Sequence, residues 1–245
     1  MVKSMPIGVI CNVCSVLFGG IFGAALSNKI PQKLKTEITL IFGVCSFGMG
    51  LSSVTLMKNM PAVVFSVILG TIFGISIHLG DAINTIAGMM KKPIAKLFPN
   101  KTSLSEEEFM NQLVTIIVLF CASGTGIYGA LVSGMTGDHS VLISKSILDF
   151  FTAAIFACNL GAVVSTVAIP QFCVEILLFL CAGLILPMTT PGMIADFKAC
   201  GGFLMLATGF RMMKVQNFPI ADMLPAMVLV MPISWLWTAV ILPLL

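Results

Sequence analysis

The sequence predicts an all-α, polytopic membrane protein, a bundle of about seven or eight transmembrane helices with one interfacial amphipathic helix. Of its 245 residues, 58% are hydrophobic and 9% are charged, whereas a soluble globular domain carries about 25% charged residues. The apolar residues form unbroken runs of about 20, the length that crosses a bilayer as a helix. Strands of a membrane barrel would instead alternate apolar and polar residues over about ten positions. We therefore expect residues 1–245 to form a single integral membrane domain.

Each expected span is an apolar run that ends at charged residues, Pro or Asn. The first run follows Lys3 and resembles a signal peptide, but its length and the basic segment after it favour a retained span. The seventh run is the shortest, and the sequence leaves open whether it crosses the membrane fully. The expected spans are residues 6–27, 37–57, 60–78, 110–132, 146–168, 172–188, 199–213 and 222–244.

Residues 78–98 differ from the spans. Their apolar residues recur at helical spacing, while Asp81, Asn84 and three lysines fill the opposite side. This pattern is typical of an amphipathic helix that lies in the membrane interface. Residues 99–108 are expected to form a polar, water-exposed loop, and Ser105 and Glu108 have the spacing of a capping box at the start of the next helix.

Two internal similarities indicate different kinds of repeat. Residues 23–37 resemble residues 161–175 around a shared Ile-Pro-Gln sequence, and this match would give parallel repeats. The second match is a spacing of seven residues between two glycines, which occurs at Gly43 and Gly50 and again at Gly202 and Gly209. This match would give inverted repeats. The sequence does not decide between these repeats, or between either of them and a chance likeness of small-residue helices.

The strongest candidate for function is a carboxylate inside an apolar span, because an ionised side chain at the centre of a span costs about 2.5 to 3.5 kcal/mol. Asp149 lies four residues after Lys145 and three after Ser146, so the three side chains share one helix face. One interpretation is a carboxylate that responds to a proton or cation, with the adjacent amine lowering the cost of its charge. The other is an i,i+4 ion pair at the mouth of the span, which only stabilises the helix.

Further polar residues lie within the apolar runs. Asn12 and Asn159 carry amides that either line a pathway or pin two helices together. Gly124 belongs to a Ser-Gly-Thr-Gly sequence that interrupts the fourth span, which allows either close packing or an unwound stretch facing a polar cavity. Glu175 is expected in the first turn of the sixth span, where the helix dipole favours a carboxylate. The candidate ion-binding residues are Asn12, Gly124, Lys145, Ser146, Asp149 and Asn159.

Several functions lack their sequence motifs. The chain has no G-x-x-x-x-G-K-[ST] phosphate loop, and neither the H-E-x-x-H motif of metalloproteases nor the G-x-S-x-G motif of hydrolases. Its eight cysteines lie mostly in apolar runs, where thiols behave as small hydrophobic groups. We therefore expect no enzymatic activity, cofactor, metal site or disulfide framework. Without a dense basic patch, nucleic acid is not an expected partner.

A set of glycines and polar residues spread over the chain also carries a family resemblance. These residues are Gly8, Asn12, Gly19, Gly20, Gly23, Cys121, Gly124, Ile127, Gly129, Gly134, Gly137, Lys145-Ser146-Ile147-Leu148-Asp149, Gly161, Gly201, Gly202, Gly209 and Leu224-Pro225-Ala226. Their pattern resembles the YqgA/YdfK-like bacterial membrane proteins, known as domain of unknown function 554. The resemblance implies an integral protein of the bacterial inner membrane, from a family discussed as candidate sodium channels or pumps without an established substrate.

Together these features predict a transporter or channel for a small cation or small solute across the bacterial plasma membrane. The expected partners are the lipid bilayer and that ion or solute. The G-x-x-x-G sequence from Gly19 to Gly23 also allows a homodimer, although such patterns are common in any helix bundle. The alternative function is a non-transporting membrane scaffold or regulator that binds a partner through its cytoplasmic loop.

Overall fold

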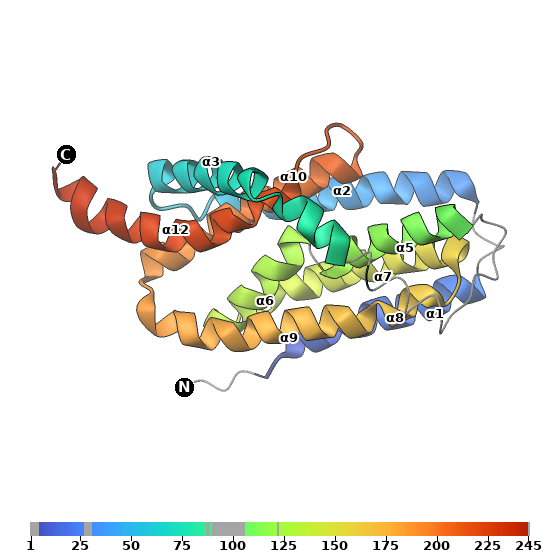
Figure 1. Ribbon diagram of the computed structural model, residues 1–245. Helices are drawn as coiled ribbons and strands as arrows, with labels where there is room; N and C mark the ends of the chain where they lie inside the picture. Colours follow the sequence, from blue (N-terminus) through green and yellow to red (C-terminus); the bar gives the residue numbers. More distant parts are fainter. Residues whose placement is uncertain (1–4, 27–30, 87–88, 90–105, 122, 245) are drawn as a thin grey trace. The chain divides into compact units, whose positions relative to one another are not determined.

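The computed structural model describes residues 5–26, 31–86, 89, 106–121 and 123–244. Every regular element in these ranges is a helix, which confirms the predicted all-α class (Figure 1). The chain divides into two compact units. The first comprises Met1–Thr39 and Ala82–Gly183, and the second comprises Leu40–Asp81 and Leu184–Leu245. The expectation of a single integral membrane domain stays a prediction.

Five helical segments of the described chain are long and apolar enough to cross a membrane, which supports a multi-pass membrane protein. They are α1 (Ile7–Ala25), α7 (Ser140–Leu160), the segment Val163–Leu184 formed by α8 (Val163–Thr166) and most of α9 (Ala168–Ile185), α10 (Pro191–Met212) and the C-terminal segment Ile220–Leu244. A sixth is α3 (Met60–Ser76) together with residues 79–86, bent by 61° at the break between them. The expected second span appears as a shorter apolar helix, Leu40–Val54, within α2 (Gln32–Val54).

The expected fourth span is divided in the structure. Its first part is α5 (Glu106–Cys121) and its second part is α6 (Gly124–Thr136). The Ser123 side chain accepts a hydrogen bond from the backbone N–H of Gly126 and so caps the start of α6. The interruption therefore includes Ser123, the first residue of the Ser-Gly-Thr-Gly sequence, whereas the other three residues already belong to α6.

Two helices begin earlier than the expected spans do. The α7 helix begins at Ser140, whose N–H and hydroxyl both donate to the carboxylate of Asp138, rather than at residue 146. The α10 helix begins at Pro191, with the Thr190 side chain accepting from the N–H of Met193. At 22 residues, α10 is long and apolar enough to cross a membrane, and its full crossing stays a prediction.

The polar segment between α3 and α5 is described only in part. Residues 79–86 form a short helix. Residues 90–105 lie outside the described residues, so the expected interfacial helix stays a prediction. Ser105 of the expected capping box is among these residues. The expected loop at 99–108 is wrong in its last three positions. Glu106 already begins α5 and Glu108 lies within its first turn.

In the first unit, glycines of α1 bring that helix against α7, and the two helices run in the same direction. Gly19 faces the backbone of Phe150, and Gly23 faces the backbone of Ala154, so closely that a Cβ at either glycine would collide with a carbonyl oxygen. The G-x-x-x-G sequence thus forms an intramolecular interface. Homodimerisation stays a prediction, but these glycines no longer support it.

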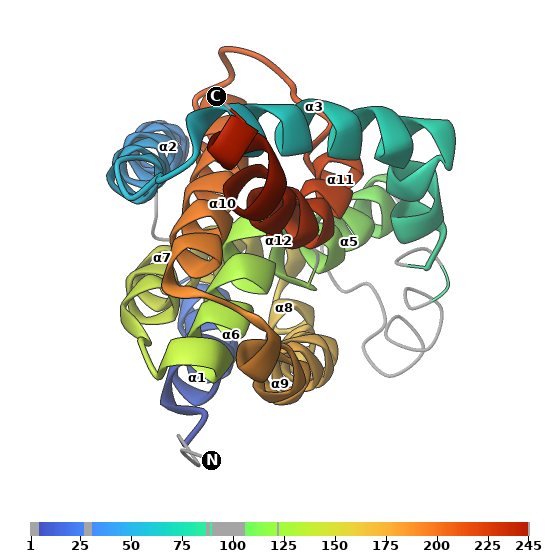
Figure 2. The same ribbon diagram turned by 90° about the vertical axis from the view of Figure 1, so that its left-hand side faces the viewer.

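In the second unit, α2 and α10 pack in opposite directions through paired glycines. A Cβ on Gly50 would lie 2.7 Å from the carbonyl oxygen of Gly202, and a Cβ on Gly43 would lie 2.9 Å from that of Gly209. The spacing match among these four glycines therefore reflects two surfaces that contact each other. Figure 2 shows α3 crossing α10 and α12 (Pro225–Leu236), and Gly70 of α3 lies directly against Ala226.

Candidate functional site

A buried ion pair lies near the midpoint of α7. Lys145 and Asp149 are one helical turn apart, only 4% and 8% exposed, and the ammonium of Lys145 contacts Oδ2 of Asp149. Because α7 begins at Ser140 and ends at Leu160, this pair sits deep within the candidate span. The two interpretations of the pair, a responsive carboxylate and an ion pair at the mouth of the span, both stay predictions. The Lys145 ammonium also lies over the ring of Phe120 from α5, at 5.9 Å from its centroid, within the range of a cation–π interaction.

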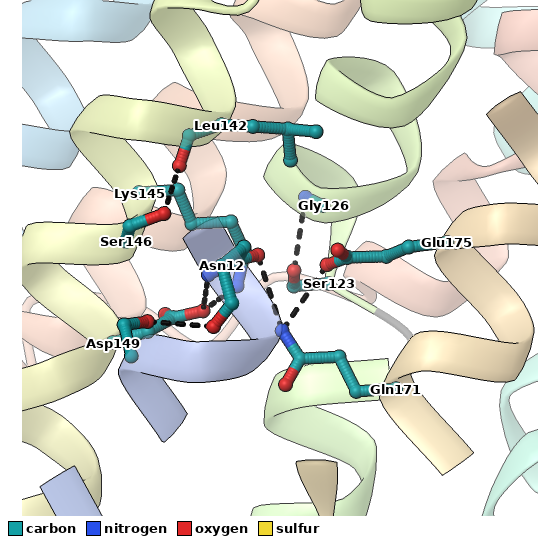
Figure 3. A network of polar contacts seen from close by, with 10 residues as sticks. Asn12, Ser123, Gly126, Leu142, Lys145, Ser146, Asp149, Gln171 and Glu175 are labelled. Atoms are coloured by element: carbon teal, nitrogen blue, oxygen red, sulfur yellow. Dashed lines mark hydrogen bonds and ion pairs between the residues drawn. The ribbon is translucent and has the colours of Figure 1, made fainter. Parts of the chain in front are cut away.

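Two further helices extend this pair into a network. Asn12 of α1 is fully buried and its Nδ2 donates to Oδ2 of Asp149 at 2.7 Å. Gln171 of α9 donates from Nε2 to Oδ1 of Asn12 and to Oε1 of Glu175, each at 3.1 Å. Figure 3 shows these five side chains, from α1, α7 and α9, converging on one place.

The start of α6 lies beside the same network. A Cβ built on Gly126 would lie 3.3 Å from Cε of Lys145 and 3.4 Å from Oε1 of Glu175. Glycine therefore allows the N-terminus of α6, which carries a partial positive charge, to approach the lysine and the glutamate. The break between α5 and α6 thus occurs where buried charges gather.

Some polar atoms of this region have no hydrogen-bond partner within the described part of the chain. They are Oε2 of Glu175, Oε1 of Gln171 and the hydroxyl of Ser165 on α8. Glu175 is 1% exposed and Gln171 is fully buried. Since the large majority of buried polar atoms in proteins are hydrogen-bonded, these open acceptors mark a place where a proton, water or ion can bind.

The structure brings together three of the six predicted site residues, namely Asn12, Lys145 and Asp149. Gly124 is the first residue of α6, two positions before the glycine that faces the network. Ser146 donates to the carbonyl oxygen of Leu142 on its own helix at 2.7 Å, and Figure 3 draws no bond from it to the network. Asn159 is exposed near the end of α7, ten residues and about 15 Å along the helix axis from Asp149.

Gln171 is not among the predicted site residues, and the expected position of Glu175 in the first turn of its helix is wrong. Because α9 begins at Ala168, Glu175 lies two turns inside the helix and not in its first turn. The spacing of the two residues, four apart in an otherwise apolar run, is the signal that could have paired them on one helix face.

A second buried carboxylate, Asp196 on α10, lies in the second unit and differs in kind. Its Oδ1 accepts from the backbone N–H groups of Lys58 and Asn59 at 2.8 and 2.9 Å. Its Oδ2 accepts from the side chains of Asn59 and Ser234 at 2.8 and 2.6 Å. Four donors satisfy this carboxylate and tie α10 to the start of α3 and to α12, so its role is structural.

Within the described residues, no group of three or more His, Cys, Asp or Glu side chains is placed to hold a metal ion. All eight cysteines are free thiols. What the site offers chemically is therefore a carboxylate pair, one ammonium and several amide oxygens.

Comparison with known proteins identifies the family. A family model described as "Protein of unknown function (DUF554)" matches residues 7–235. The chain belongs to this family. It is 47% identical over 236 residues to a protein named "Uncharacterized protein YqgA" from Escherichia coli (strain K12), a match that covers 96% of this chain and 99% of that protein. The DUF554 resemblance drawn from the sequence is thus confirmed.

A more distant DUF554 relative is named "Uncharacterized membrane protein YdfK", from Bacillus subtilis (strain 168). It is 22% identical over 225 residues, which cover 91% of this chain and 93% of that protein. No solved structure matches the chain.

Proposed function

We propose that this DUF554 protein carries a small cation across the bacterial plasma membrane and has no enzymatic activity. The observation that supports the proposal is the network on α1, α7 and α9, in which two carboxylates and one ammonium lie buried within candidate membrane spans. Transport is the function that most directly uses charged groups at such a depth.

Stability alone gives little reason for such a network. Burying an ion pair removes two charges from water, and well-packed apolar residues in its place are often neutral or stabilising. Ionisable residues inside spans are therefore rare, and they mark ion pathways and proton relays in membrane proteins. The pairing of Lys145 with Asp149 reduces the cost of these two charges and leaves the second carboxylate, Glu175, available to a mobile cation.

The surrounding backbone also suits a carrier. Transporter sites are commonly built where helices are broken near the membrane midplane. Here the α5–α6 break places Gly126 against Lys145 and Glu175, and glycine contacts line the α1–α7 interface. Such small-residue interfaces allow helices to pack closely and to shift against each other.

The proposal is tested by flux in proteoliposomes with radioactive sodium and with a pH-sensitive dye. Asp149→Asn keeps the shape of the side chain and removes its charge, so we expect flux to fall at least tenfold. Asp81→Asn is the matched control, because the Asp81 carboxylate is exposed, with 83% of its side-chain surface accessible. Equal flux in the wild type and Asp149→Asn would remove this residue from the mechanism. Wild-type flux no faster than that of empty liposomes, for both ions, would remove the proposal.

The alternative of a scaffold depends on the segment between α3 and α5. Residues 90–105 of that segment lie outside the described residues. The described geometry therefore gives this alternative no support of its own.

A further inference from the structure

We propose that Glu175 is the group that takes up and releases the transported ion, that this ion is a proton, and that Oε2 of Glu175 is the atom that binds it. The inference rests on the proposed transport function and names its substrate. It assigns the Lys145–Asp149 pair a fixed role, as the charges that hold Glu175 ready for exchange.

The two carboxylates differ in their hydrogen bonds. Oδ2 of Asp149 accepts from Asn12 and from the Lys145 ammonium, so two donors satisfy this oxygen. Glu175 receives a single bond, from Gln171 to Oε1, while Oε2 has no partner in the described part of the chain. A proton on Oε2 would break none of the bonds in this network.

The charges around Glu175 do not balance when it is ionised. From α7 it faces Lys145 and Asp149, which cancel each other, and from α5 the Cys121 thiol interacts with it electrostatically. Its own helix contributes the Cys173 thiol near Cys121, and the groups from α1 and α6 are the uncharged Asn12 and Gly126. An ionised Glu175 therefore leaves one uncompensated negative charge on a buried side chain, which is unfavourable.

Either a proton or a metal cation could cancel this charge, and the geometry favours the proton. A Cβ built on Gly126 would lie within 3.4 Å of both Lys145 and Glu175, so the space beside these side chains is small. A metal cation takes several ligands, and no group of three or more His, Cys, Asp or Glu side chains in the described part of the chain is placed to supply them. A proton adds no volume to this space and requires no further oxygen ligands.

Lys145 also makes release of the proton feasible. When the O–H bond at Oε2 breaks and the proton passes to water, the ammonium of Lys145 and the N-terminus of α6 lie close enough to stabilise the ionised Glu175. The cycle therefore consists of O–H bond formation with a proton from one side of the membrane and O–H bond cleavage towards the other. No other bond is made or broken.

Infrared difference spectroscopy of the protein in lipid nanodiscs tests this assignment without a transport assay. Raising the pH should remove a carbonyl band of a protonated carboxylic acid from the wild type, and this band should be missing from Glu175→Gln at every pH. Glu175→Asp keeps the acid and should keep a shifted band, which distinguishes loss of the group from loss of the fold. In Lys145→Met the ionised form loses its nearest cation, so the band should persist to higher pH. A band that Glu175→Gln retains would overturn the assignment.

Dicyclohexylcarbodiimide provides a second, independent readout, because it modifies protonated carboxyl groups in apolar surroundings. We expect mass spectrometry to find the adduct on Glu175 and not on Asp149, with labelling that declines as the pH rises. Sodium that protects Glu175 from labelling at constant pH would overturn the proton as the ion. If Glu175 titrates but the protein moves neither protons nor sodium, the transport function is refuted. The assignment of Glu175 as the group that binds and releases a proton would remain.

Discussion

The contribution of Asn12 to the network can be measured by Asn12→Leu, which keeps the volume of the side chain and removes its polar atoms. Asp149 would lose a hydrogen bond to a charged group, worth about 1.5 to 3 kcal/mol. Gln171 would lose a neutral bond between helices, worth about 0.6 kcal/mol in a membrane protein. We therefore expect a loss of about 2 to 4 kcal/mol in the free energy of unfolding, measured by denaturation with sodium dodecyl sulfate in mixed micelles.

Asn59→Leu is the matched control for this measurement. The side-chain amide of Asn59 donates to Asp196 at 2.8 Å, as that of Asn12 does to Asp149 at 2.7 Å. However, Asp196 keeps three other donors, two backbone N–H groups and Ser234, whereas Asp149 keeps only Lys145 among the residues that the structure describes. The Asn12 variant should therefore lose more stability than the Asn59 variant. Equal losses, or a loss below about 0.5 kcal/mol for Asn12→Leu, would refute the reasoning.

Two further predictions concern glycines. Gly23→Leu should prevent α1 from packing on α7, since even a Cβ would collide with the carbonyl of Ala154. We therefore expect this variant to lose the monodisperse peak in size-exclusion chromatography. Gly48→Leu is the control and should elute as the wild type does, because a Cβ at Gly48 meets nothing within 4 Å. Gly126→Val should press on Lys145 and Glu175 and reduce flux at least tenfold while the protein remains folded, and a variant with wild-type flux would show that this approach is not needed.

The class of the protein and part of its site could be predicted because both depend on local sequence. Apolar runs of membrane length predict helices, and the i,i+4 spacing of Lys145 and Asp149 predicts a shared face. The position of this pair within its helix could not be predicted, since α7 begins at Ser140, where Asp138 accepts bonds from the first residue of the helix. The expected span begins at residue 146 and therefore excludes Lys145, which is the sixth residue of α7.

The partners of the buried carboxylates could not be predicted for a different reason. Asn12 and Asp149 are 137 residues apart, as are Asn59 and Asp196, and no local pattern connects residues at such a distance. Two of the donors to Asp196 are backbone N–H groups, which are present at nearly every position and leave no trace in the sequence. Glu175 is expected at a helix end because Pro170 and Gln171 interrupt the apolar run, whereas α9 begins at Ala168 and continues through both.

Proton flux through Glu175 provides the most direct test of the account. Proteoliposomes containing the wild type, with a pH-sensitive dye trapped inside, should dissipate an imposed pH gradient faster than empty liposomes do. Liposomes containing Glu175→Gln should retain the gradient as long as empty liposomes retain it, although the variant elutes as a folded protein. If Glu175→Gln dissipates the gradient at the wild-type rate, protons do not pass through this carboxylate and the account is contradicted.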